Sequence, residues 1–338
     1  MRENLGRELS AMFPRGEISE VGSSSFLVAT SSPLDLPLFV AYSIQSLPAA
    51  RKVTGTSVRE LADAVMGEIF RSLPSACPAW RLGVFGSPGD ARVESRGALL
   101  EEQVLERIED RSRKLLRSRV SSSDPFHADE TTAQVLLVAP DTAFVSFVTP
   151  DMRVGFEPVL SPMTAGRAEV ENDPRPPARA YQKLLEAEAQ LGVAIGSGDR
   201  CVDLGCTPGS WSYIALTREA TVVGVDRAEP DQEVTLHEQF TFQRGDGFAY
   251  TPSAPVHWLL CDIVAPPQQT LELLQRWLRE RWCEKFIVTF KFKGDPDIRI
   301  LTRLKELLRQ QCGHAFVRHL THNKNEVTAA GVVKPFRS

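Results

Sequence analysis

The stretch RCVDLGCTPGSWSYIALTREATVVGVD, residues 200–226, decides the fold of this chain. A short apolar run ends at Asp203 and Gly205, and a turn rich in Thr, Pro, Gly and Ser leads into a helix predicted from Trp211. A second apolar strand then closes on Asp226. In a doubly wound sheet such glycines let the backbone approach a ligand, and such an acid accepts the hydroxyl protons of a ribose. We therefore expect a ligand that carries an adenosine.

The loop itself narrows the choice of ligand, because its pattern is D-L-G-C-T-P-G-S. A dinucleotide requires G-x-G-x-x-G and a triphosphate G-x-x-x-x-G-K-[ST], and neither is present. An acid before the first glycine suits a ligand with a cationic amino-acid end, so we predict S-adenosylmethionine; the alternative is an ordinary turn without a ligand. The residues predicted to bind this cofactor are Asp203, Gly205, Thr207, Pro208, Gly209, Ser210, Trp211, Asp226, Asp246 and Asp262.

Composition limits the class of protein. With 338 residues, 42% of them hydrophobic and 24% charged, the chain is long enough for two or three globular cores. Its net charge of −4 lacks the basic excess of most nucleic-acid-binding proteins, so any RNA contact must come from local patches. Six cysteines without a C-x-x-C pair indicate free thiols, and we expect no membrane span and a cytoplasmic protein.

The first half of the chain is predicted to form two small α+β units. Residues 1–75 make the first unit and residues 76–150 the second, followed by a linker rich in Pro, Gly and charge over 151–175. Strands are predicted at Ser24–Thr30, Pro37–Ile44, Trp80–Phe85, Gln134–Ala139 and Thr142–Val148, and helices at Val58–Ser72 and Gly97–Arg119.

The end of the second helix is strongly basic. The stretch RSRKLLRSR, Arg111–Arg119, carries five basic residues and no acid. Cations near a helix C-terminus are often solvated and favoured by the helix dipole. The other interpretation is a patch that contacts the phosphates of a nucleic acid.

Residues 176–338 alternate strands and helices. After a helix at Ala178–Leu191 and the organising stretch, strands are predicted at 240–243, 257–261, 286–292, 314–320 and 326–333, with helices at 268–282 and 297–312. Two final strands in succession must pair antiparallel, which is the layout of a Rossmann-like class I methyltransferase with a seven-stranded mixed sheet. Ligands of such sheets lie at the carboxyl ends of the strands, where the predicted cofactor acids fall.

Four charged residues lie next to apolar sequence in this half: Lys183, Asp262, Lys291 and Glu326. Each alone could be a solvated charge at the end of an element. Lys291, however, lies inside the predicted strand FIVTFKF, where a lysine requires a polar site. If two lysines and two acids come together, each ammonium makes it easier for the other to lose a proton, and the acids hold the lysine side chains in place. A neutral lysine could then take a proton from a ribose hydroxyl as that hydroxyl attacks a sulfonium methyl group.

The same residues carry a family resemblance. The segments are RAYQKLLEA, VDLGCTPGSWSY, VVGVD, RGDGF, LLCDIV, IVTFK and HNKNEVT. In this order they resemble the 23S ribosomal RNA 2′-O-ribose methyltransferases of the RlmM type, relatives of the FtsJ-like RNA methyltransferases. The resemblance implies a catalytic Lys-Asp-Lys-Glu tetrad at Lys183, Asp262, Lys291 and Glu326. It also implies methyl transfer to a ribose 2′-hydroxyl, that of a cytidine in 23S ribosomal RNA, and ferredoxin-like and THUMP RNA-binding modules over 1–75 and 76–150.

The sequence departs from that pattern in places. The family's C-P-G-G loop appears as Thr207–Ser210, and Lys293 stands where the family has a proline after the catalytic lysine. Lys293 is therefore a rival to Lys291 as the base. His319 and His322 have a metal-like spacing without a third ligand nearby, so we assign no metal site.

Two other functions remain open on the sequence. The chain could methylate a small molecule or a protein, or it could be a diverged RNA-binding protein without activity. The four-residue constellation and the separate amino-terminal half favour an RNA methyltransferase over both.

Overall fold

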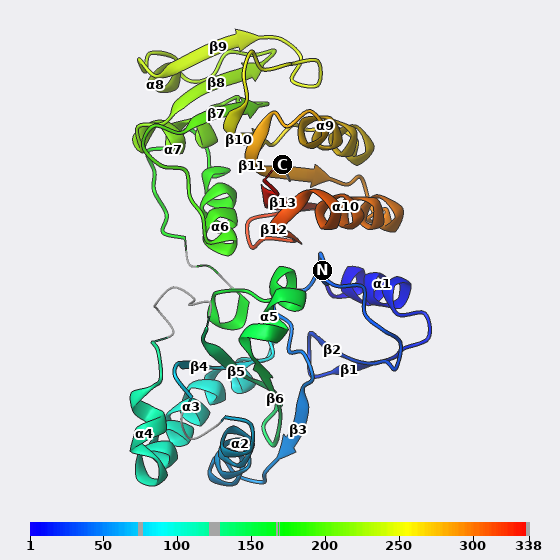
Figure 1. Cartoon of the computed structure of the whole chain (residues 1–338), viewed down its shortest axis with the longest axis vertical. Coiled ribbons are helices and arrows are strands. Elements are labelled where there is room, and N and C mark those ends of the chain that lie inside the picture. Colours follow the sequence, from blue (N-terminus) through cyan, green and yellow to red (C-terminus); the bar gives the residue numbers. More distant parts are fainter. Residues whose placement is uncertain (74–76, 122–128, 167, 169, 336–338) are drawn as a thin grey trace. The chain divides into compact units, whose positions relative to one another are not determined.

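The chain forms two compact units in the computed structural model, which describes residues 1–73, 77–121, 129–166, 168 and 170–335 (Figure 1). The amino-terminal unit comprises Arg2–Leu38 and Ile44–Arg167. The carboxy-terminal unit comprises Met1, Phe39–Ser43 and Ala168–Ser338. Residues 167 and 169 of the predicted linker lie outside the described residues.

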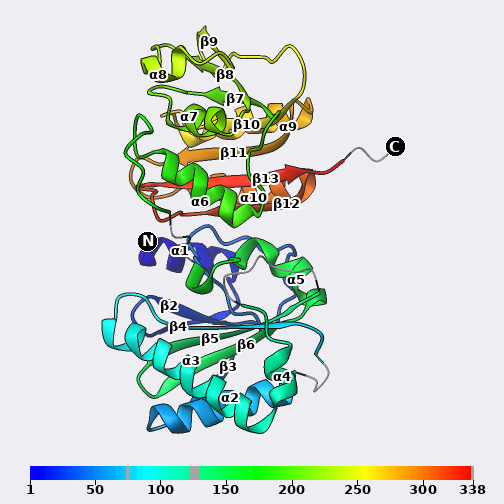
Figure 2. The same cartoon turned by 90° about the vertical axis from the view of Figure 1, so that its left-hand side faces the viewer.

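The amino-terminal unit contains a four-stranded sheet in the order β3-β6-β5-β4. The strands are β3 (Arg51–Thr54), β4 (Trp80–Gly86), β5 (Thr131–Ala139) and β6 (Thr142–Val148). β4 and β5 are parallel, while β6 pairs antiparallel with both β5 and β3. Helices α2 (Val58–Ser72) and α3 (Ala91–Arg111) cover one face of the sheet (Figure 2). The strand, helix and hairpin predicted from the sequence are therefore present.

Both covering helices follow from local sequence signals. Ser57 caps α2 by accepting a hydrogen bond from the Glu60 amide, and Asp90 caps α3. Apolar residues at helical spacing, such as Leu61 and Val104, are fully buried against the sheet. The long helix predicted at Gly97–Arg119 begins earlier and is broken at Ser112, whose hydroxyl caps the short helix α4 (Arg113–Arg117).

Further elements surround this sheet. They are α1 (Arg2–Met12), the antiparallel pair β1 (Glu17–Val21) and β2 (Ser25–Ala29), and α5 (Pro150–Phe156), followed by short 3₁₀ turns at Glu157–Val159 and Thr164–Gly166. α5 occupies part of the range predicted as a linker, because Thr149 caps its first turn and Pro150 fits there. β3, from the first predicted unit, pairs with β6 from the second. The ferredoxin-like and THUMP assignments stay predictions.

The carboxy-terminal unit contains a seven-stranded mixed sheet in the order β12-β13-β11-β10-β7-β8-β9. Its strands are β7 (Arg200–Leu204), β8 (Thr221–Asp226), β9 (Phe240–Arg244), β10 (Val256–Cys261), β11 (Cys283–Lys291), β12 (Cys312–Arg318) and β13 (Glu326–Val333). Five neighbouring strands run parallel: β11, β10, β7, β8 and β9. β13 lies between β11 and β12 and is antiparallel to both. The predicted class I sheet is thus confirmed.

Helices cover both faces of this sheet. In Figure 1, α6 (Tyr181–Leu191) and α7 (Ser210–Thr217) lie on one face, and α9 (Pro267–Arg279) and α10 (Ile298–Gln311) on the other. A short helix, α8 (Gln232–Thr235), precedes β9. The central strands are apolar because both of their faces are covered, and Trp258 and Leu259 of β10 are fully buried.

All six cysteines are buried and unpaired, as the sequence predicted. Burial raises the pKa of the Cys261 thiol to about 12, so this sulfur stays protonated at neutral pH. Among the described residues, no helix combines the length and apolar character needed to cross a lipid bilayer.

The predicted strand at Pro37–Ile44 was wrong. Residues 39–43 form turns and belong to the carboxy-terminal unit, although the chain on either side belongs to the amino-terminal unit. The His319 amide donates to the carbonyl of Ala41 at 2.7 Å, and the rings of Tyr42 and His319 lie 6.0 Å apart. The apolar residues that resembled a strand are therefore buried by contacts that include this hydrogen bond and this ring pair, and not by a sheet ladder.

We predict that Tyr42→Ala accelerates hydrogen exchange of the His319 amide about two- to tenfold. An aromatic pair contributes about 0.5–1.5 kcal/mol beyond its buried area, and its loss frees the segment that accepts this amide's hydrogen bond. Exchange measured by mass spectrometry on peptides covering 312–325 provides the test. Phe70→Ala, at an exposed ring of the other unit, is the control, and equal exchange in both variants would contradict the prediction.

Candidate active site

A cavity of ≈ 880 Å³ lies at the carboxyl ends of the parallel strands. Five of the residues predicted to bind the cofactor line it: Gly205, Thr207, Asp226, Asp246 and Asp262. These residues follow four different strands, and parallel strands bring their carboxyl ends to one edge of a sheet. The volume lies within the range of pockets that hold ligands of cofactor size, about 300–1,000 Å³.

The acid at the end of β8 is held in a fixed position. Asp226 accepts hydrogen bonds from the backbone amides of Thr207 and Ala228, each at 3.1 Å. The Thr207 hydroxyl in turn donates to the Ala228 carbonyl at 2.6 Å. Two amide bonds leave lone pairs on both carboxylate oxygens, so Asp226 can still accept the two hydroxyl protons of a ribose.

The turn before the cavity requires glycine at its first position. Gly205 has φ +77°, and a Cβ there would come within 2.6 Å of the Ile263 side chain. Its backbone amide donates a hydrogen bond to the carbonyl of Val225, in the neighbouring strand, at 2.8 Å. A larger residue would push Ile263 and close this edge of the cavity, so the backbone geometry fits a ligand that approaches the chain closely.

The other predicted cofactor residues are not among the described residues that line the cavity. Pro208, Gly209 and Ser210 form the turn into α7, where the Pro208 carbonyl accepts from the Asp231 amide at 3.0 Å. Trp211 is buried, and its ring nitrogen donates to the Ala180 carbonyl at 2.8 Å. Pro208 and Trp211 thus hold the loop to residue 231 and to the residue before α6.

Asp203 is buried beneath the loop, with 2% of its surface exposed. The Ser212 hydroxyl donates to its carboxyl at 2.7 Å. Burial raises the pKa of Asp203 to about 7, although the bond from Ser212 acts against this shift. Around neutral pH this group is therefore divided between the protonated and ionised forms.

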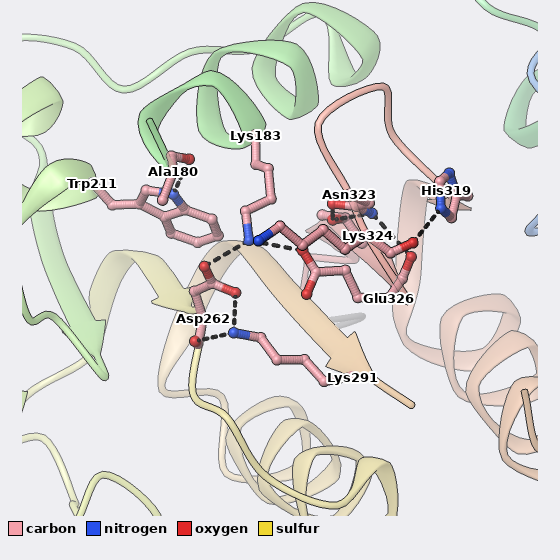
Figure 3. Close-up of polar contacts among 10 residues, drawn as sticks. Ala180, Lys183, Trp211, Asp262, Lys291, His319, Asn323, Lys324 and Glu326 are labelled. Atoms are coloured by element: carbon pink, nitrogen blue, oxygen red, sulfur yellow. Dashed lines mark hydrogen bonds and ion pairs between the residues drawn. The ribbon is translucent and has the colours of Figure 1, made fainter. Parts of the chain in front are cut away.

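The four residues of the predicted constellation come together next to the cavity (Figure 3). Lys183 of α6 places its ammonium 2.8 Å from Asp262 and 2.9 Å from Glu326. Burial opposes the charge on Lys183, but the two carboxylates outweigh it and raise its pKa. Lys183 is thus held as an ammonium that joins the end of β10 to the start of β13.

The second lysine reaches the same acid from the other side (Figure 3). Lys291 donates to the Asp262 main-chain carbonyl at 2.9 Å and lies 3.0 Å from one carboxylate oxygen. It is the last residue of β11 and is paired with Glu326 in the antiparallel register of β11 and β13. Lys291 thus ends β11 directly after five buried residues, Phe286–Phe290.

Lys293, the rival for the base, lies beyond the end of β11 and is exposed. Within the described residues it makes no ion pair with Asp262 or Glu326. The geometry therefore joins Lys291 to the cluster and leaves Lys293 outside it.

Sequence reasoning missed part of the cavity wall. Phe248 and Arg227 line it next to Asp246, and Gln269, Glu272 and Arg276 line it from α9. Arg276 donates to the Phe248 carbonyl at 2.5 Å, which ties the helix to the loop after β9. Phe248 could have been found from its place in G-D-G-F after a strand. The α9 residues carry no such signal, because only the tertiary fold turns that helix face toward the cavity.

His319 and His322, which have a metal-like spacing, lie between β12 and β13, and Nε2 of His319 donates to the Lys324 carbonyl at 2.9 Å. No group of three or more His, Cys, Asp or Glu side chains in the described part of the chain is arranged to hold a metal ion.

The sheet order, the cavity at the strand ends and the lysine–carboxylate cluster beside it define the carboxy-terminal unit as a class I methyltransferase, dependent on S-adenosylmethionine. Comparison with known families agrees, since residues 177–323 match the FtsJ-like methyltransferase family. Residues 177–323 of this unit thus make up an FtsJ-like methyltransferase domain.

Relatives extend the similarity to both units. The chain is 26% identical over 316 residues to the ribosomal RNA large subunit methyltransferase M of Yersinia pestis (strain Pestoides F), covering 86% of this chain and 83% of the relative. The protein of the same name from Yersinia pseudotuberculosis serotype O:1b gives the same values.

Among solved structures, a putative hemolysin from Lactococcus lactis is 13% identical, with a TM-score of 0.39, and covers 48% of this chain and 90% of its own. A 1,6-didemethyltoxoflavin-N1-methyltransferase from Burkholderia thailandensis is 18% identical, with a TM-score of 0.34, and covers 46% of this chain and 79% of its own.

We predict that Asp203→Asn removes part of the pH dependence of stability. The pKa of this carboxyl is raised to about 7 in the folded protein, above an ordinary value of about 3.9. Between about pH 4 and pH 7 the folded chain retains a proton that the unfolded chain loses, so stability falls as pH rises through this window. The total effect is at most about 4 kcal/mol.

Urea unfolding of the wild-type protein and the variant between pH 5 and pH 8 measures this slope. Asn stays neutral, so the variant should gain stability relative to wild type as the pH rises. Asp231→Asn, at an exposed acid, should leave the slope unchanged. Parallel curves for wild type and Asp203→Asn would show that Asp203 does not titrate in this window.

Proposed function

We propose that this protein transfers a methyl group from S-adenosylmethionine to a ribose 2′-hydroxyl of large-subunit ribosomal RNA. One observation carries the proposal: Asp262 belongs both to the cavity wall and to the lysine–carboxylate cluster. A methyl donor in the cavity would therefore lie beside a group of residues suited to proton transfer. No comparable arrangement is needed to bind RNA alone.

The reaction requires a proton to leave the attacking hydroxyl. The cofactor supplies a methyl group on a positively charged sulfur, which makes that carbon electrophilic. Held in the cavity by Gly205, Asp226 and Asp246, the cofactor would supply this methyl group to the 2′-oxygen and would leave as a neutral thioether. The hydroxyl proton must go to a base within hydrogen-bond reach.

The two lysines support different roles in this step. The raised pKa of Lys183 keeps it an ammonium, which holds Asp262 and Glu326 in place and makes it unsuited to accept a proton. We assign the general base to Lys291, whose side chain is 20% exposed, against 9% for Lys183, and so is the more accessible to a substrate. Asp262 orients both lysines and Glu326 orients Lys183, and the two carboxylates balance the charge of the lysines.

The proposed substrate follows from the relatives and from the amino-terminal unit. The Yersinia relatives are named ribosomal RNA large subunit methyltransferases, and they align with both units. By the resemblance noted in the sequence, the target is a cytidine ribose of 23S ribosomal RNA. Arg113, Lys114 and Arg117 are exposed and form no ion pair within the described residues, which leaves them available to phosphates.

The proposed function is tested by incubating the purified protein with S-adenosylmethionine and 23S ribosomal RNA from cells that lack the gene. Mapping of 2′-O-methylation should then show one new modified position. A parallel reaction with 16S ribosomal RNA controls for unspecific transfer. Absence of ribose methylation with binding of RNA alone would favour a non-catalytic protein.

We predict that Lys291→Ala lowers the single-turnover rate of methyl transfer by about 10²- to 10⁴-fold, the usual loss for a general base. Affinity for S-adenosylmethionine should stay nearly unchanged, because Asp226 and the loop at Gly205 lie elsewhere on the cavity wall. Lys293→Ala is the matched control, a lysine two residues away and outside the cluster. If Lys293→Ala is the inactive variant, the base is assigned to the wrong lysine.

We predict that reversing the charges of Arg113, Lys114 and Arg117 to Glu weakens RNA binding. The logarithm of the affinity should also fall less steeply with the logarithm of salt concentration, by roughly one unit of slope for each phosphate that the variant no longer neutralises. Filter binding across a salt series measures both effects. The control reverses three other exposed charges of the same unit: Lys52, Arg59 and Arg92. A slope equal to that of wild type would mean that α4 carries only solvated charges.

A further inference from the structure

The connection between β12 and β13, residues 319–325, is bonded to both elements that carry the lysines of the cluster. Its last residue, Asn325, directly precedes Glu326. Its side-chain amide donates to the carbonyls of Phe292 and Gly294, at 2.9 and 2.8 Å. Both carbonyls belong to the turn that immediately follows Lys291.

A backbone hydrogen bond between the same two residues adds to this contact, with Phe292 as the donor. The Phe292 amide donates to the Asn325 carbonyl at 2.9 Å, one residue beyond the Lys291–Glu326 pair of the ladder. Asn325 and Phe292 therefore exchange two hydrogen bonds, and a third bond reaches Gly294. One side chain thus fixes the path of the chain after Lys291 relative to the start of β13.

The same connection is bonded to α6. The Thr321 amide and hydroxyl both donate to the carboxylate of Glu186 at 2.9 Å. Glu186 is buried and lies three residues after Lys183, on the same face of α6. Residues 319–325 thus link α6, which carries Lys183, to the start of β13, where Glu326 pairs with Lys183.

We propose that Asn325 is a positioning residue for methyl transfer, which sets the distance from Lys291 to Asp262 by clamping the turn after β11 to the start of β13. The proposal rests on the function proposed above. Asn325 lies outside the described wall of the cavity and makes no bond to the four cluster side chains, so it acts through the backbone. The side-chain nitrogen of Asn325 carries two N–H donors, one for each carbonyl.

The test compares Asn325→Ala and Asn325→Asp with wild type in single-turnover transfer. The Asp variant keeps the shape but replaces the donor by an oxygen that repels both carbonyls. Both variants should be about 10- to 100-fold slower, the usual effect of a displaced catalytic group. Affinities for S-adenosylmethionine and RNA should change less than about twofold by the same reasoning, because neither site uses Asn325. Asn172→Ala, at an exposed asparagine, is the control.

Two further readouts separate positioning from general loosening of the fold. In a Lys291→Ala background, Asn325→Ala should cost nothing more, because its effect passes through Lys291. The midpoint of the pH–rate profile should also move in Asn325→Ala, whereas loss of folded protein would lower the rate equally at every pH. The proposal would be overturned if Asn325→Ala slowed the Lys291→Ala protein as much as it slows wild type. It would also be overturned if Asn325→Ala kept both the wild-type rate and the wild-type midpoint.

Hydrogen exchange keeps the inference separate from the function on which it rests. The amide of Phe292 should exchange faster in Asn325→Ala, and peptides covering 284–296 report this without any reaction. If wild-type protein transfers no methyl group, the proposed function fails and exchange alone decides whether the clamp exists. If wild type is active and Asn325→Ala matches it in rate and exchange, the clamp is refuted while the proposed function stands. Thr321→Val, which removes the hydroxyl bond to Glu186 and keeps the amide bond, repeats the test from the α6 side.

Discussion

The ammonium of Lys183 is the constraint on which the active site depends. It is nearly removed from water, and a buried charge is tolerated only where opposite charges and hydrogen bonds replace the lost solvation. Asp262 and Glu326 supply both at 2.8 and 2.9 Å. Because these acids come from β10 and β13, their shared cation fixes α6 against two strands of the sheet. The cluster can exist only when helix and sheet are packed correctly.

The cofactor cavity depends on a different feature, the common direction of the parallel strands. Four strands end at one edge of the sheet. Asp226, Asp246 and Asp262, at the ends of three of them, and Gly205, after the fourth, line one cavity. Asp262 is the residue shared by the two arrangements, as the end of β10 and as the partner of both lysines. A displacement of β10 would therefore disturb the cavity wall and the lysine–carboxylate cluster together. The antiparallel insertion of β13 adds Glu326, which no purely parallel sheet could bring opposite Lys291.

The loops contribute order that strand pairing does not provide. Residues 319–325 bond to α6, to the turn after β11 and to residues 39–43. The last contact is unusual in origin, because those residues lie in the sequence among elements of the amino-terminal unit. Their apolar character is typical of a strand, yet a hydrogen bond and an aromatic pair hold them to the methyltransferase unit. Burial alone therefore does not distinguish a strand from a packed turn.

The sequence by itself determined the succession of strands and helices in the methyltransferase unit, the glycine-containing turn after β7 and the identity of the four clustered residues. Periodicity, glycine in a left-handed turn and charge next to apolar strands are local signals. Each depends only on residues that are close in the sequence, so it can be read without the fold. Only the tertiary structure decided that Lys291 and not Lys293 meets Asp262, because strand register sets which of two similar lysines reaches the cluster. It also placed Asp203 and Trp211 behind the cavity and brought α9 and Asn325 to their positions. Such contacts join residues far apart in the chain, so no local pattern records them.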